Sequence, residues 1–460
     1  MDRRKFIKSN ALFLTSVYIM KPEQYLIEKR MNEIKISAYD SNFEREKLRF
    51  PFGFKGGYLT ELWQVVSQLR SGNGNIGVGL ATQSVLYGDA AVFEKNSEAN
   101  GNALMYVLTN RALQLIEGKS FYNPIELLQE IIPKLFEEAK RLTDTIDLNI
   151  NFVYNALISV DNALWTLYAK ENDITTFHTL LPESYREAFS YQNDKVAVMF
   201  QISYDMPASD IKQAVEEGYF IFKIKTGYPG SQEDMLKKDM ERLKEVHAIL
   251  KEVRTAQTPT GSVYYTMDAN GRYESKSGLK KYLDYAKEIG AFEYILLYEE
   301  PFVEPNNEDV SDLEVMIAAD ESIHTEEDAY RKIELGYGAF VLKGIAKTLS
   351  LTAKIAKIAH ENDIPCLCAD LTVNPILIDW NKNIAATMSP FPIIGMGMME
   401  TNGDMNYRNW EEMKRRHPHA EAEWTKVQNG VFELNEDFYN TAGGIFDISD
   451  YYNNFFKIKG

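Results

Sequence analysis

The chain has 460 residues, of which 45% are hydrophobic and 25% charged, a composition typical of folded globular proteins rather than disordered ones. This length is enough for a large barrel and a second domain. The formal net charge of -17 argues against nucleic acid or an anionic membrane surface as a partner, because both select basic patches.

The first 31 residues differ in pattern from the rest of the chain. A basic start precedes a short apolar run, which is too short to span a membrane. The segment from Arg3 to Lys8, RRKFIK, resembles the twin-arginine export motif with isoleucine in place of leucine. A small-x-small cleavage site is missing, so an amphipathic helix is the alternative interpretation. We therefore predict a periplasmic protein, with a cytoplasmic one as the alternative.

Residues 32–191 are predicted to form an α+β domain. IKISAYDSNF, from Ile34, has the pattern of a strand, and two further strand-like runs flank the turn SGNGN that begins at Ser71. Helical patterns follow at 102–118, 124–143 and 151–171. A hairpin followed by several helices is typical of a compact α+β domain.

Between residues 192 and 425, eight buried strand-like runs alternate with segments that are mostly amphipathic helices. Alternating strands and helices predict a parallel sheet, and eight such units predict a closed α/β barrel. Cys366 and Cys368 lie two residues apart on one of these strands, a poor arrangement for a disulfide or a zinc site. We expect residues 426–460, rich in Tyr, Phe and Asn, to pack back on the two domains.

Five of the barrel runs end in a residue suited to metal or proton chemistry. They are FIFKIKTG, YYTMDAN, YILLYEEPF, MIAADES and AFVLKGIAK, and the residues are Lys225, Asp268, Glu299, Asp320 and Lys343. Successive members are 43, 31, 21 and 23 residues apart, long enough for a strand, a helix and two loops. Barrels of this kind place their chemistry at the C-terminal ends of the strands.

The three carboxylates are weak signals when taken singly. Asp268 alone is compatible with an Asx-turn, and Asp320 alone with a helix cap. Glu299 and Glu300 alternate in direction, so only one faces the barrel mouth. Because three consecutive strands each present a carboxylate at the same end, we predict a site for a hard divalent cation, Mg²⁺.

The lysines suggest proton transfer. Lys223 and Lys225 share one face of their strand. Lys343 follows four strands after Lys225, which places the two on opposite sides of an eight-stranded barrel. A surface lysine is the alternative interpretation for each, but these strands are strongly apolar. A substrate between the two lysines can lose a proton on one face and gain one on the other.

On these motifs the chain resembles the enolase superfamily. KIKTG resembles the family's Lys-x-Lys strand, MDAN, YEEP and ADES resemble its three metal-binding strands, and the LK of AFVLKG resembles its sixth-strand lysine. The resemblance runs from about residue 32 to the C-terminus. It implies a modified (β/α)₇β barrel with an N-terminal α+β capping domain. It also implies Mg²⁺ on the three carboxylates, an acid/base pair of Lys225 and Lys343, and Lys223 as a neighbouring cation.

Within the superfamily the pattern resembles the muconate-lactonising branch. The segment CADLT carries no histidine, whereas the mandelate racemase branch uses one after the seventh strand. The branch includes dipeptide epimerases, such as L-Ala-D/L-Glu epimerase, N-acyl amino acid racemases, cycloisomerases and o-succinylbenzoate synthases. All remove a proton next to a carboxylate and hold the enolate on the metal. The resemblance therefore implies an Mg²⁺-dependent epimerase or racemase acting on a dipeptide or N-acyl amino acid.

Two alternatives remain from the same motifs. One is a lyase or cycloisomerase, including acid-sugar dehydratases, and the other is a catalytically inactive binding protein. The implied partner is a small carboxylate substrate. Similar proteins occur as dimers, tetramers and octamers, so a homo-oligomer is also compatible with the resemblance.

Departures from the family pattern leave the substrate open. Dipeptide epimerases usually carry Asp-x-Asp at the eighth strand, where METNGD offers Glu400 and Asp404 at another spacing. The sixth-strand motif Lys-x-x-Lys-x-Gly-Gly becomes Lys343-Gly-Ile-Ala-Lys347-Thr.

Further residues are predicted to contact the substrate. Asn270 follows one metal strand, and Asp370 either faces the mouth or caps the next helix. Family capping loops close over the substrate, so PFGFKGG, with Phe54 and three glycines, is predicted as a mobile lid. An ordinary glycine-rich turn is the alternative.

Overall fold

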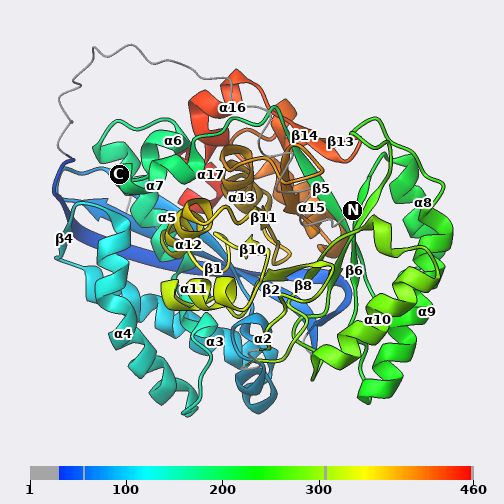
Figure 1. Cartoon of the computed structure of the whole chain (residues 1–460). Helices are drawn as coiled ribbons and strands as arrows, with labels where there is room; N and C mark the ends of the chain where they lie inside the picture. The colour runs from blue at the N-terminus through cyan, green and yellow to red at the C-terminus, as the bar shows by residue number, and fades with distance from the viewer. Residues whose placement is uncertain (1–30, 55–56, 305–307, 457–460) are drawn as a thin grey trace.

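The computed structural model describes residues 31–54, 57–304 and 308–456, and these form two packed domains (Figure 1). An antiparallel sheet with helices makes up the first domain, and a parallel barrel makes up the second. The twin-arginine-like motif of Arg3 to Lys8 lies outside the described residues. Its role in export stays a prediction.

A four-stranded antiparallel sheet, in the order β3-β2-β1-β4, is the base of the capping domain. The predicted hairpin around Ser71 is confirmed. The first strand is longer than the sequence pattern indicated, because Phe52 still pairs with Leu59, and PFGF is strand rather than loop. The strands are β1 (Ile34–Phe54), β2 (Gly57–Ser71), β3 (Ile76–Gln83) and β4 (Ser120–Phe121).

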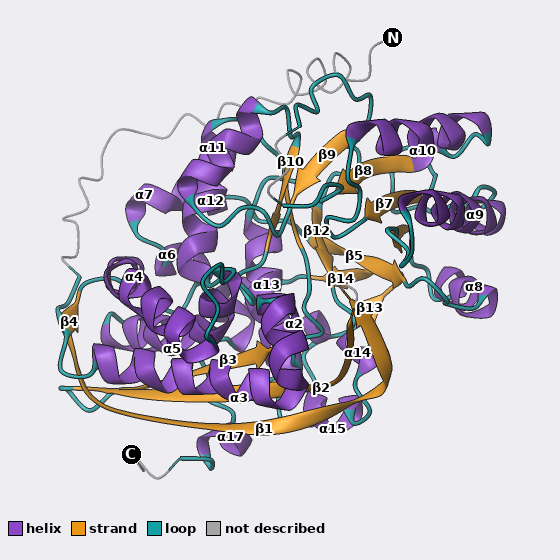
Figure 2. Ribbon diagram, turned by 90° about the horizontal axis from the view of Figure 1, so that it is seen from below, coloured by secondary structure: helices purple, strands orange, loops and turns teal. Residues whose placement is uncertain are grey.

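Three long helices cover one side of this sheet (Figure 2). The helix α5 packs closest to β3, because the strand carries glycines where the helix backbone approaches. A Cβ at Gly79 would lie 2.1 Å from the carbonyl oxygen of Ser159, and one at Gly77 would lie 2.4 Å from that of Ala163. The helices of this domain are α2 (Val85–Gly88), α3 (Ala90–Ile116), α4 (Pro124–Thr143) and α5 (Asn151–Glu171), followed by the short α6 (Phe177–Leu180) and α7 (Glu183–Arg186).

Eight parallel strands form the barrel, in the order β5 to β12, and β12 pairs with β5 to close it. The predicted barrel with a capping domain is therefore confirmed. Its strands are β5 (Lys195–Ile202), β6 (Ile221–Lys225), β7 (Tyr264–Asp268), β8 (Ile295–Glu299), β9 (Met316–Ala319), β10 (Ala339–Leu342), β11 (Cys366–Cys368) and β12 (Gly397–Glu400).

Six helices connect the barrel strands, and local capping signals explain where several of them begin. The Ser231 hydroxyl accepts the Asp234 N–H, and Thr325 and Asp328 form a capping box. The described part of the β8–β9 connection contains no helix. The helices are α8 (Ala208–Glu216), α9 (Gln232–Leu250), α10 (Lys276–Glu288), α11 (Glu326–Glu334), α12 (Leu349–Glu361) and α13 (Pro375–Thr387).

The C-terminal segment contacts both domains. Its hairpin pairs with β5 in the barrel. Farther along, the Tyr452 hydroxyl accepts a hydrogen bond from Asn374 in the barrel at 2.6 Å, and the Phe455 carbonyl accepts one from Asn42 of β1 at 3.1 Å. The elements after β12 are α14 (Gly403–Asn406), α15 (Trp410–Arg415), β13 (Val427–Gln428), β14 (Val431–Glu433), α16 (Glu436–Thr441) and α17 (Asp450–Asn453).

Buried hydrogen bonds fasten the capping domain to the loops after the barrel strands. The Ser350 hydroxyl of α12 donates to Asp161 of α5 at 2.5 Å, and the indole N–H of Trp165 donates to the same hydroxyl at 3.1 Å. The Tyr154 hydroxyl donates to the carbonyl of His324, after β9, at 2.8 Å. These contacts hold α5 and the neighbouring α2 against the C-terminal face of the barrel.

Candidate active site

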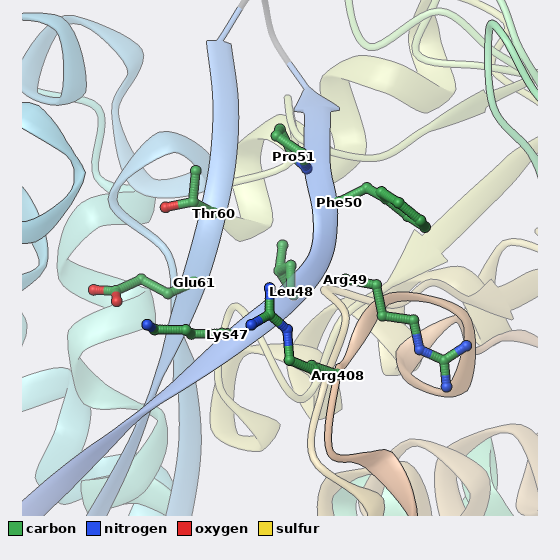
Figure 3. Close-up of a pocket in the computed structure, with 8 residues that line it drawn as sticks. All are labelled: Lys47, Leu48, Arg49, Phe50, Pro51, Thr60, Glu61 and Arg408. Carbon is green, nitrogen blue, oxygen red and sulfur yellow. The ribbon is translucent and has the colours of Figure 1, made fainter.

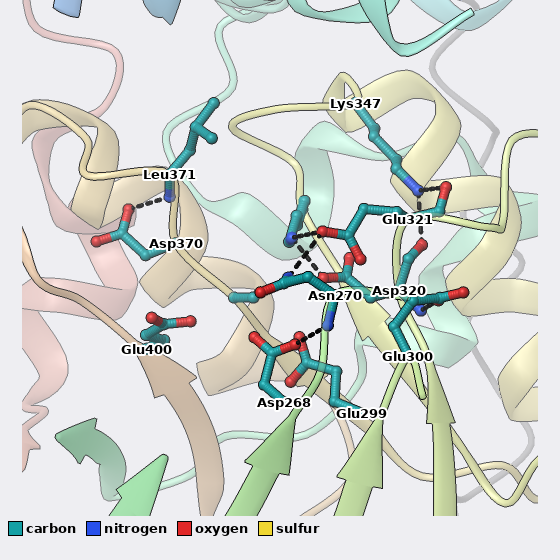
Figure 4. Close-up of polar contacts among 12 residues, drawn as sticks. Asp268, Asn270, Glu299, Glu300, Asp320, Glu321, Lys347, Asp370, Leu371 and Glu400 are labelled. Carbon is teal, nitrogen blue, oxygen red and sulfur yellow. Dashed lines mark hydrogen bonds and ion pairs between the residues drawn. The ribbon is translucent and has the colours of Figure 1, made fainter. Parts of the chain in front are cut away.

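Four of the five predicted chemical residues lie together at the C-terminal ends of neighbouring strands, and Figure 4 shows three of them, Asp268, Glu299 and Asp320. Lys225, Asp268 and Glu299 are successive register partners on β6, β7 and β8. Asp320 follows β9 two residues after Ala318, which pairs with Glu299. Side chains alternate along a strand, so these four share the inner face. We call Asp268, Glu299 and Asp320 the carboxylate cluster.

Lys223 lies at the centre of this cluster and is almost completely buried. Its Nζ is 3.1 Å from Asp268 Oδ2, 2.9 Å from Glu299 Oε1 and 2.9 Å from Glu400 Oε2. Burial alone would lower its pKa, but the carboxylates raise it well above the usual lysine value. Lys223 is therefore a cation that joins β6 to β7, to β8 and, past β5, to β12.

Lys225 forms hydrogen bonds to two side chains of the barrel. Its Nζ lies 2.5 Å from Asp268 Oδ2 and 2.9 Å from Asn270 Oδ1. Asn270, in the left-handed region with φ 45°, also donates to Glu321 Oε1 at 3.1 Å. The Lys225 side chain is 11% exposed, against 2% for Lys223. It is therefore the more accessible of the two to a molecule at the barrel mouth.

Lys343 lies on the other side of the barrel, because β10 is four strands from β6. Its Nζ is 2.5 Å from Asp320 Oδ2 and 3.9 Å from Glu321 Oε1. The same Nζ lies over the ring of Tyr87, 5.4 Å from the centroid. Burial lowers the pKa of Lys343, but Asp320 and Glu321 outweigh it and raise the pKa well above its usual value.

Opposite charges set the protonation of the cluster. Burial raises the pKa of Glu299 well above its usual value, and the neighbouring Asp268 raises it further. Burial would raise the pKa of Asp268 as well, but Lys223 and Lys225 outweigh it and lower this pKa. Asp320 has a lowered pKa for the same reason, since Lys343 outweighs the burial. The cluster therefore combines two aspartates whose pKa values are lowered with a glutamate whose pKa is raised.

The donor chemistry of this cluster fits a hard cation. Three buried carboxylate oxygens, Glu299 Oε2, Asp320 Oδ1 and Glu321 Oε2, have no hydrogen-bond partner among the described residues. An unsatisfied buried acceptor is costly, and oxygen-only ligation is what Mg²⁺ prefers. In the described part of the chain, however, no three His, Cys, Asp or Glu side chains group closely enough to hold a metal ion together. The lysine ammonium groups stand between the carboxylates and compensate their charge.

Two buried side chains fix the loop that carries Asp320. Lys347 donates to the backbone carbonyls of Asp320, Glu321 and Ile323 at 2.6, 3.0 and 2.8 Å. Glu300 accepts the Asp320 N–H at 2.7 Å, so the adjacent glutamates have separate roles: Glu299 faces the cluster and Glu300 holds a loop. Burial lowers the pKa of Lys347 to about 8 and raises that of Glu300 to about 7.

The predicted substrate-contact residues divide into two groups. Asn270 and Glu400 touch the lysines of the cluster, as described above. Asp370 instead accepts the N–H groups of Leu371, Val373 and Asn402 at 2.6, 3.1 and 2.8 Å, so it fastens the loop after β11 to the end of β12. It does not cap α13, whose N-cap is Asn374.

The other two predicted contacts lie elsewhere. Asp404 is exposed in the first turn of α14 and makes none of the recorded contacts with the cluster. It lies four residues after Glu400, beyond the end of β12. Phe54 ends β1, and its side chain lies outside what the structure describes. A substrate contact for either residue stays a prediction.

A basic hollow lies where β1 separates from β2 (Figure 3). Residues 48–51 of β1 face the single residue Thr60 of β2, because the register shifts between Lys47 and Phe52. The Thr60 N–H and hydroxyl instead donate hydrogen bonds to the Glu98 carboxylate of α3, at 2.8 and 2.5 Å. The hollow has a volume of about 320 Å³ and is lined by Lys47, Leu48, Arg49, Phe50, Pro51, Thr60, Glu61 and Arg408.

Sequence reasoning missed two residues of the site, Tyr87 and Glu321. Glu321 directly follows Asp320, and this position next to a predicted metal ligand could have identified it as a site residue. Tyr87 lies in VLYG, which carries no motif. Only the packing of the capping domain on the barrel brings its ring to Lys343.

A closed parallel barrel with charged residues at the C-terminal ends of its strands, under an α+β cap, is an architecture of barrel enzymes. Residues 207–429 match the family model described as Enolase C-terminal domain-like. The barrel therefore carries an enolase C-terminal-like domain, and the resemblance predicted from the sequence is confirmed.

Solved structures with the same fold come from the mandelate racemase/muconate lactonizing branch. A mandelate racemase/muconate lactonizing protein from Herpetosiphon aurantiacus has a TM-score of 0.64 at 14% identity, covering 89% of this chain and 97% of that one. A dipeptide epimerase from Enterococcus faecalis V583, complexed with Mg and the dipeptide L-Leu-L-Tyr, has a TM-score of 0.61 at 17% identity, with coverages of 89% and 99%. The 2-chloromuconate cycloisomerase from Rhodococcus opacus 1CP has a TM-score of 0.59 at 18% identity, with coverages of 87% and 94%.

At these sequence identities, the similarity shows that the three proteins and this chain have a common fold. None of the curated proteins matches the chain by sequence. Among the helices that the structure describes, none has the length and apolar character needed to cross a membrane.

Proposed function

We propose that this protein is an Mg²⁺-dependent epimerase or racemase. It removes and returns the α-proton of a carboxylate substrate, a dipeptide or an N-acylated amino acid. The observation that carries the proposal is the placement of Lys225 and Lys343 on opposite sides of one carboxylate cluster. Inversion at a carbon needs an acid/base group on each face of that carbon. The dipeptide epimerase that shares this fold was solved with Mg and a dipeptide, which supports the choice of substrate class.

Each lysine must alternate between a neutral base and a charged acid. Lys343 Nζ lies 2.5 Å from Asp320, and this carboxylate favours the charged form of the lysine by raising its pKa. Mg²⁺ held by Asp268, Glu299 and Asp320 would supply positive charge that stabilises the negative charge developing on the substrate and offsets this preference. One lysine, when neutral, takes the α-proton, and the opposite ammonium returns a proton to the other face.

Lys223 has a different role in this proposal. It is buried and bonded to three carboxylates, so it has no free path to a substrate. It holds Asp268, Glu299 and Glu400 at short distances from one another, and its charge keeps this acidic site stable before a substrate arrives. We propose it as a supporting cation and not as a proton carrier.

A difference in exposure between the two lysines favours a lyase or cycloisomerase as the second candidate function. The Lys343 side chain is only 5% exposed, against 11% for Lys225, and it lies beneath Tyr87. A lysine that stays charged in this position stabilises negative charge and exchanges no proton. The cycloisomerase among the structures of this fold is compatible with that chemistry.

Proton exchange in D₂O tests the proposal. We would incubate the protein with Mg²⁺ and a library of dipeptides and N-acyl amino acids, and measure deuterium uptake by mass spectrometry and configuration by chiral chromatography. We expect uptake of one deuterium with inversion for one subset of the library. Lys225→Ala and Lys343→Ala should each abolish exchange from one epimer, while Lys382→Ala, which removes a buried lysine outside the site, should not discriminate between epimers. Exchange and inversion at the wild-type rate by Lys343→Ala would refute the proposal.

A further inference from the structure

The capping domain contributes one side chain to the lysine on the far side of the barrel. Tyr87, on the four-residue helix α2, is 1% exposed. Lys343 Nζ lies over its ring at 5.4 Å from the centroid, within the range of roughly 6 Å over which an ammonium group is attracted to an aromatic face. The ring therefore borders this ammonium, which Asp320 approaches from the barrel.

Buried asparagines fix the position of α2. The Ser84 N–H donates to Asn155 Oδ1 of α5 at 2.9 Å, and the Val85 N–H donates to Asn102 Oδ1 of α3 at 2.8 Å. Both asparagines are fully buried. The Ser84 hydroxyl also accepts the Tyr87 N–H as the helix cap. The backbone that carries Tyr87 is thus held from both neighbouring helices.

Close packing leaves α2 little room to shift. A Cβ at Gly101 of α3 would lie 2.4 Å from Val85 Cγ2, and a Cβ at Gly88 would lie 3.0 Å from the Cα of Phe152. Only glycine allows approaches this short. The ring of Tyr87 therefore moves only when the capping domain moves, and its place above Lys343 depends on how the two domains dock.

Lys343 is contacted from both domains. Lys343 has Asp320 in the barrel and a ring from the capping domain. A lysine side chain has four rotatable bonds, so a partner on one side alone leaves the ammonium group free to turn about that partner.

We infer that Tyr87 is a positioning residue for Lys343: its ring confines the ammonium group to the face from which it reaches the substrate. This inference rests on the proposed function. Its consequence is that loss of the Tyr87 ring slows proton transfer through Lys343 more than proton transfer through Lys225.

Epimer-specific exchange measures this asymmetry. Initial rates of deuterium uptake are recorded from each pure epimer with Mg²⁺, for the wild type, Tyr87→Leu and Tyr87→Phe. Lys343→Ala identifies which epimer exchanges through Lys343. From that epimer we expect Tyr87→Leu to be roughly 5- to 30-fold slower, as loss of a desolvated cation–π contact implies. From the other epimer we expect a change of less than about twofold, and Tyr87→Phe, which keeps the ring, should recover most of the lost rate.

Two controls separate positioning from general damage. Tyr168→Leu removes an equally buried tyrosine of the same domain that has no recorded contact with Lys343. It should slow both epimers equally or neither. An equal loss from both epimers in Tyr87→Leu, or no loss from either, would overturn the inference.

A readout independent of activity distinguishes failure of this inference from failure of the proposed function. Acetylation of Lys343 by an amine-reactive ester is followed by peptide mass spectrometry, with the buried Lys382 as internal reference. Loss of the Tyr87 ring should expose the ammonium and raise labelling of Lys343 several-fold in Tyr87→Leu, but not in Tyr87→Phe. Unchanged labelling would overturn the inference whatever the substrate is. Absence of exchange by the wild type, with labelling raised, would refute the proposed function alone.

Discussion

Replacing Lys223 by methionine tests whether this lysine balances the charge of the acidic site. Methionine preserves most of the buried volume but removes the charge that lies within 3.1 Å of Asp268, Glu299 and Glu400. The raised pKa of Lys223 means that its stabilising contribution is fully present at neutral pH and is lost only as the pH rises through that value. The variant therefore lacks the whole contribution at pH 7.

The expected cost follows from the burial of the groups left behind. Removing one partner of a buried ion pair costs about 3–5 kcal/mol. Glu299, whose pKa burial already raises, can take up a proton and relieve part of the repulsion, so three contacts do not triple this cost. With an unfolding entropy of about 2.1 cal/mol/K per residue, a chain of this length loses roughly 1 °C of Tm per kcal/mol. We expect Tm to fall by roughly 3–5 °C without metal.

Calorimetry with and without Mg²⁺ is the assay. We expect the difference in Tm between Lys223→Met and the wild type to narrow from pH 8 to pH 5, because protonation removes the uncompensated charge of the buried carboxylates. We also expect Mg²⁺ to restore more stability to Lys223→Met than to the wild type, because the variant has uncompensated carboxylates. The control is Lys382→Met, which removes another buried lysine, one that pairs with Asp379 at 2.5 Å.

The reasoning would be refuted by either of two results. If metal-free Lys223→Met were as stable as the wild type, the three carboxylates would not need this cation. If Mg²⁺ stabilised Lys223→Met and Lys382→Met equally, the carboxylates left without Lys223 would not be binding a metal ion.

Three further predictions follow from the site and its surroundings. Asp320→Asn should lower Mg²⁺ affinity, measured by calorimetric titration, by at least about 100-fold, more than the loss of an outer-shell partner. Burial raises the pKa of Asp161 to about 6 from its usual 3.8, so the folded state binds the extra proton and stability falls as the pH rises from about 4 to about 6. Asp161→Asn should remove this fall of roughly 3 kcal/mol, seen in urea unfolding; an unchanged pH profile would contradict it. Charge reversal of the hollow by Lys47→Glu with Arg408→Glu should raise KM for an anionic substrate several-fold at low salt, with little change in kcat, and the effect should shrink as salt is added. A KM that stays the same at every ionic strength would show that the hollow does not attract substrate.

The barrel and its charged residues were predictable because their signals are local. Each key residue ends an apolar run, and the spacing of the runs fixes their order around the barrel. The alternation of side chains along a strand also predicted that Glu299 and Glu300 point in different directions, and in the structure they contact different partners. Such inferences need only the periodicity of one strand and the direction of its neighbours.

The features that escaped prediction depend on contacts between distant segments. Nothing near Tyr87 indicates a lysine, since its partner is on another domain. Glu400 pairs with Lys223, 177 residues away in the sequence, whereas Asp404 at nearly the same sequence position is exposed. The strand-like character of PFGF comes from its pairing with β2, which outweighs the turn preference of its proline and glycine.

The C-terminal segment bears on the order in which this protein folds. The hydrogen bond from Asn42 to the carbonyl of Phe455 joins residues 413 positions apart, and Tyr452 binds the barrel through Asn374. Contacts of such long range form late, because the entropy of closing the loop must be met first. We therefore expect each domain to gain its own core during synthesis, and their mutual docking to be completed only after residues 452–455 have left the ribosome.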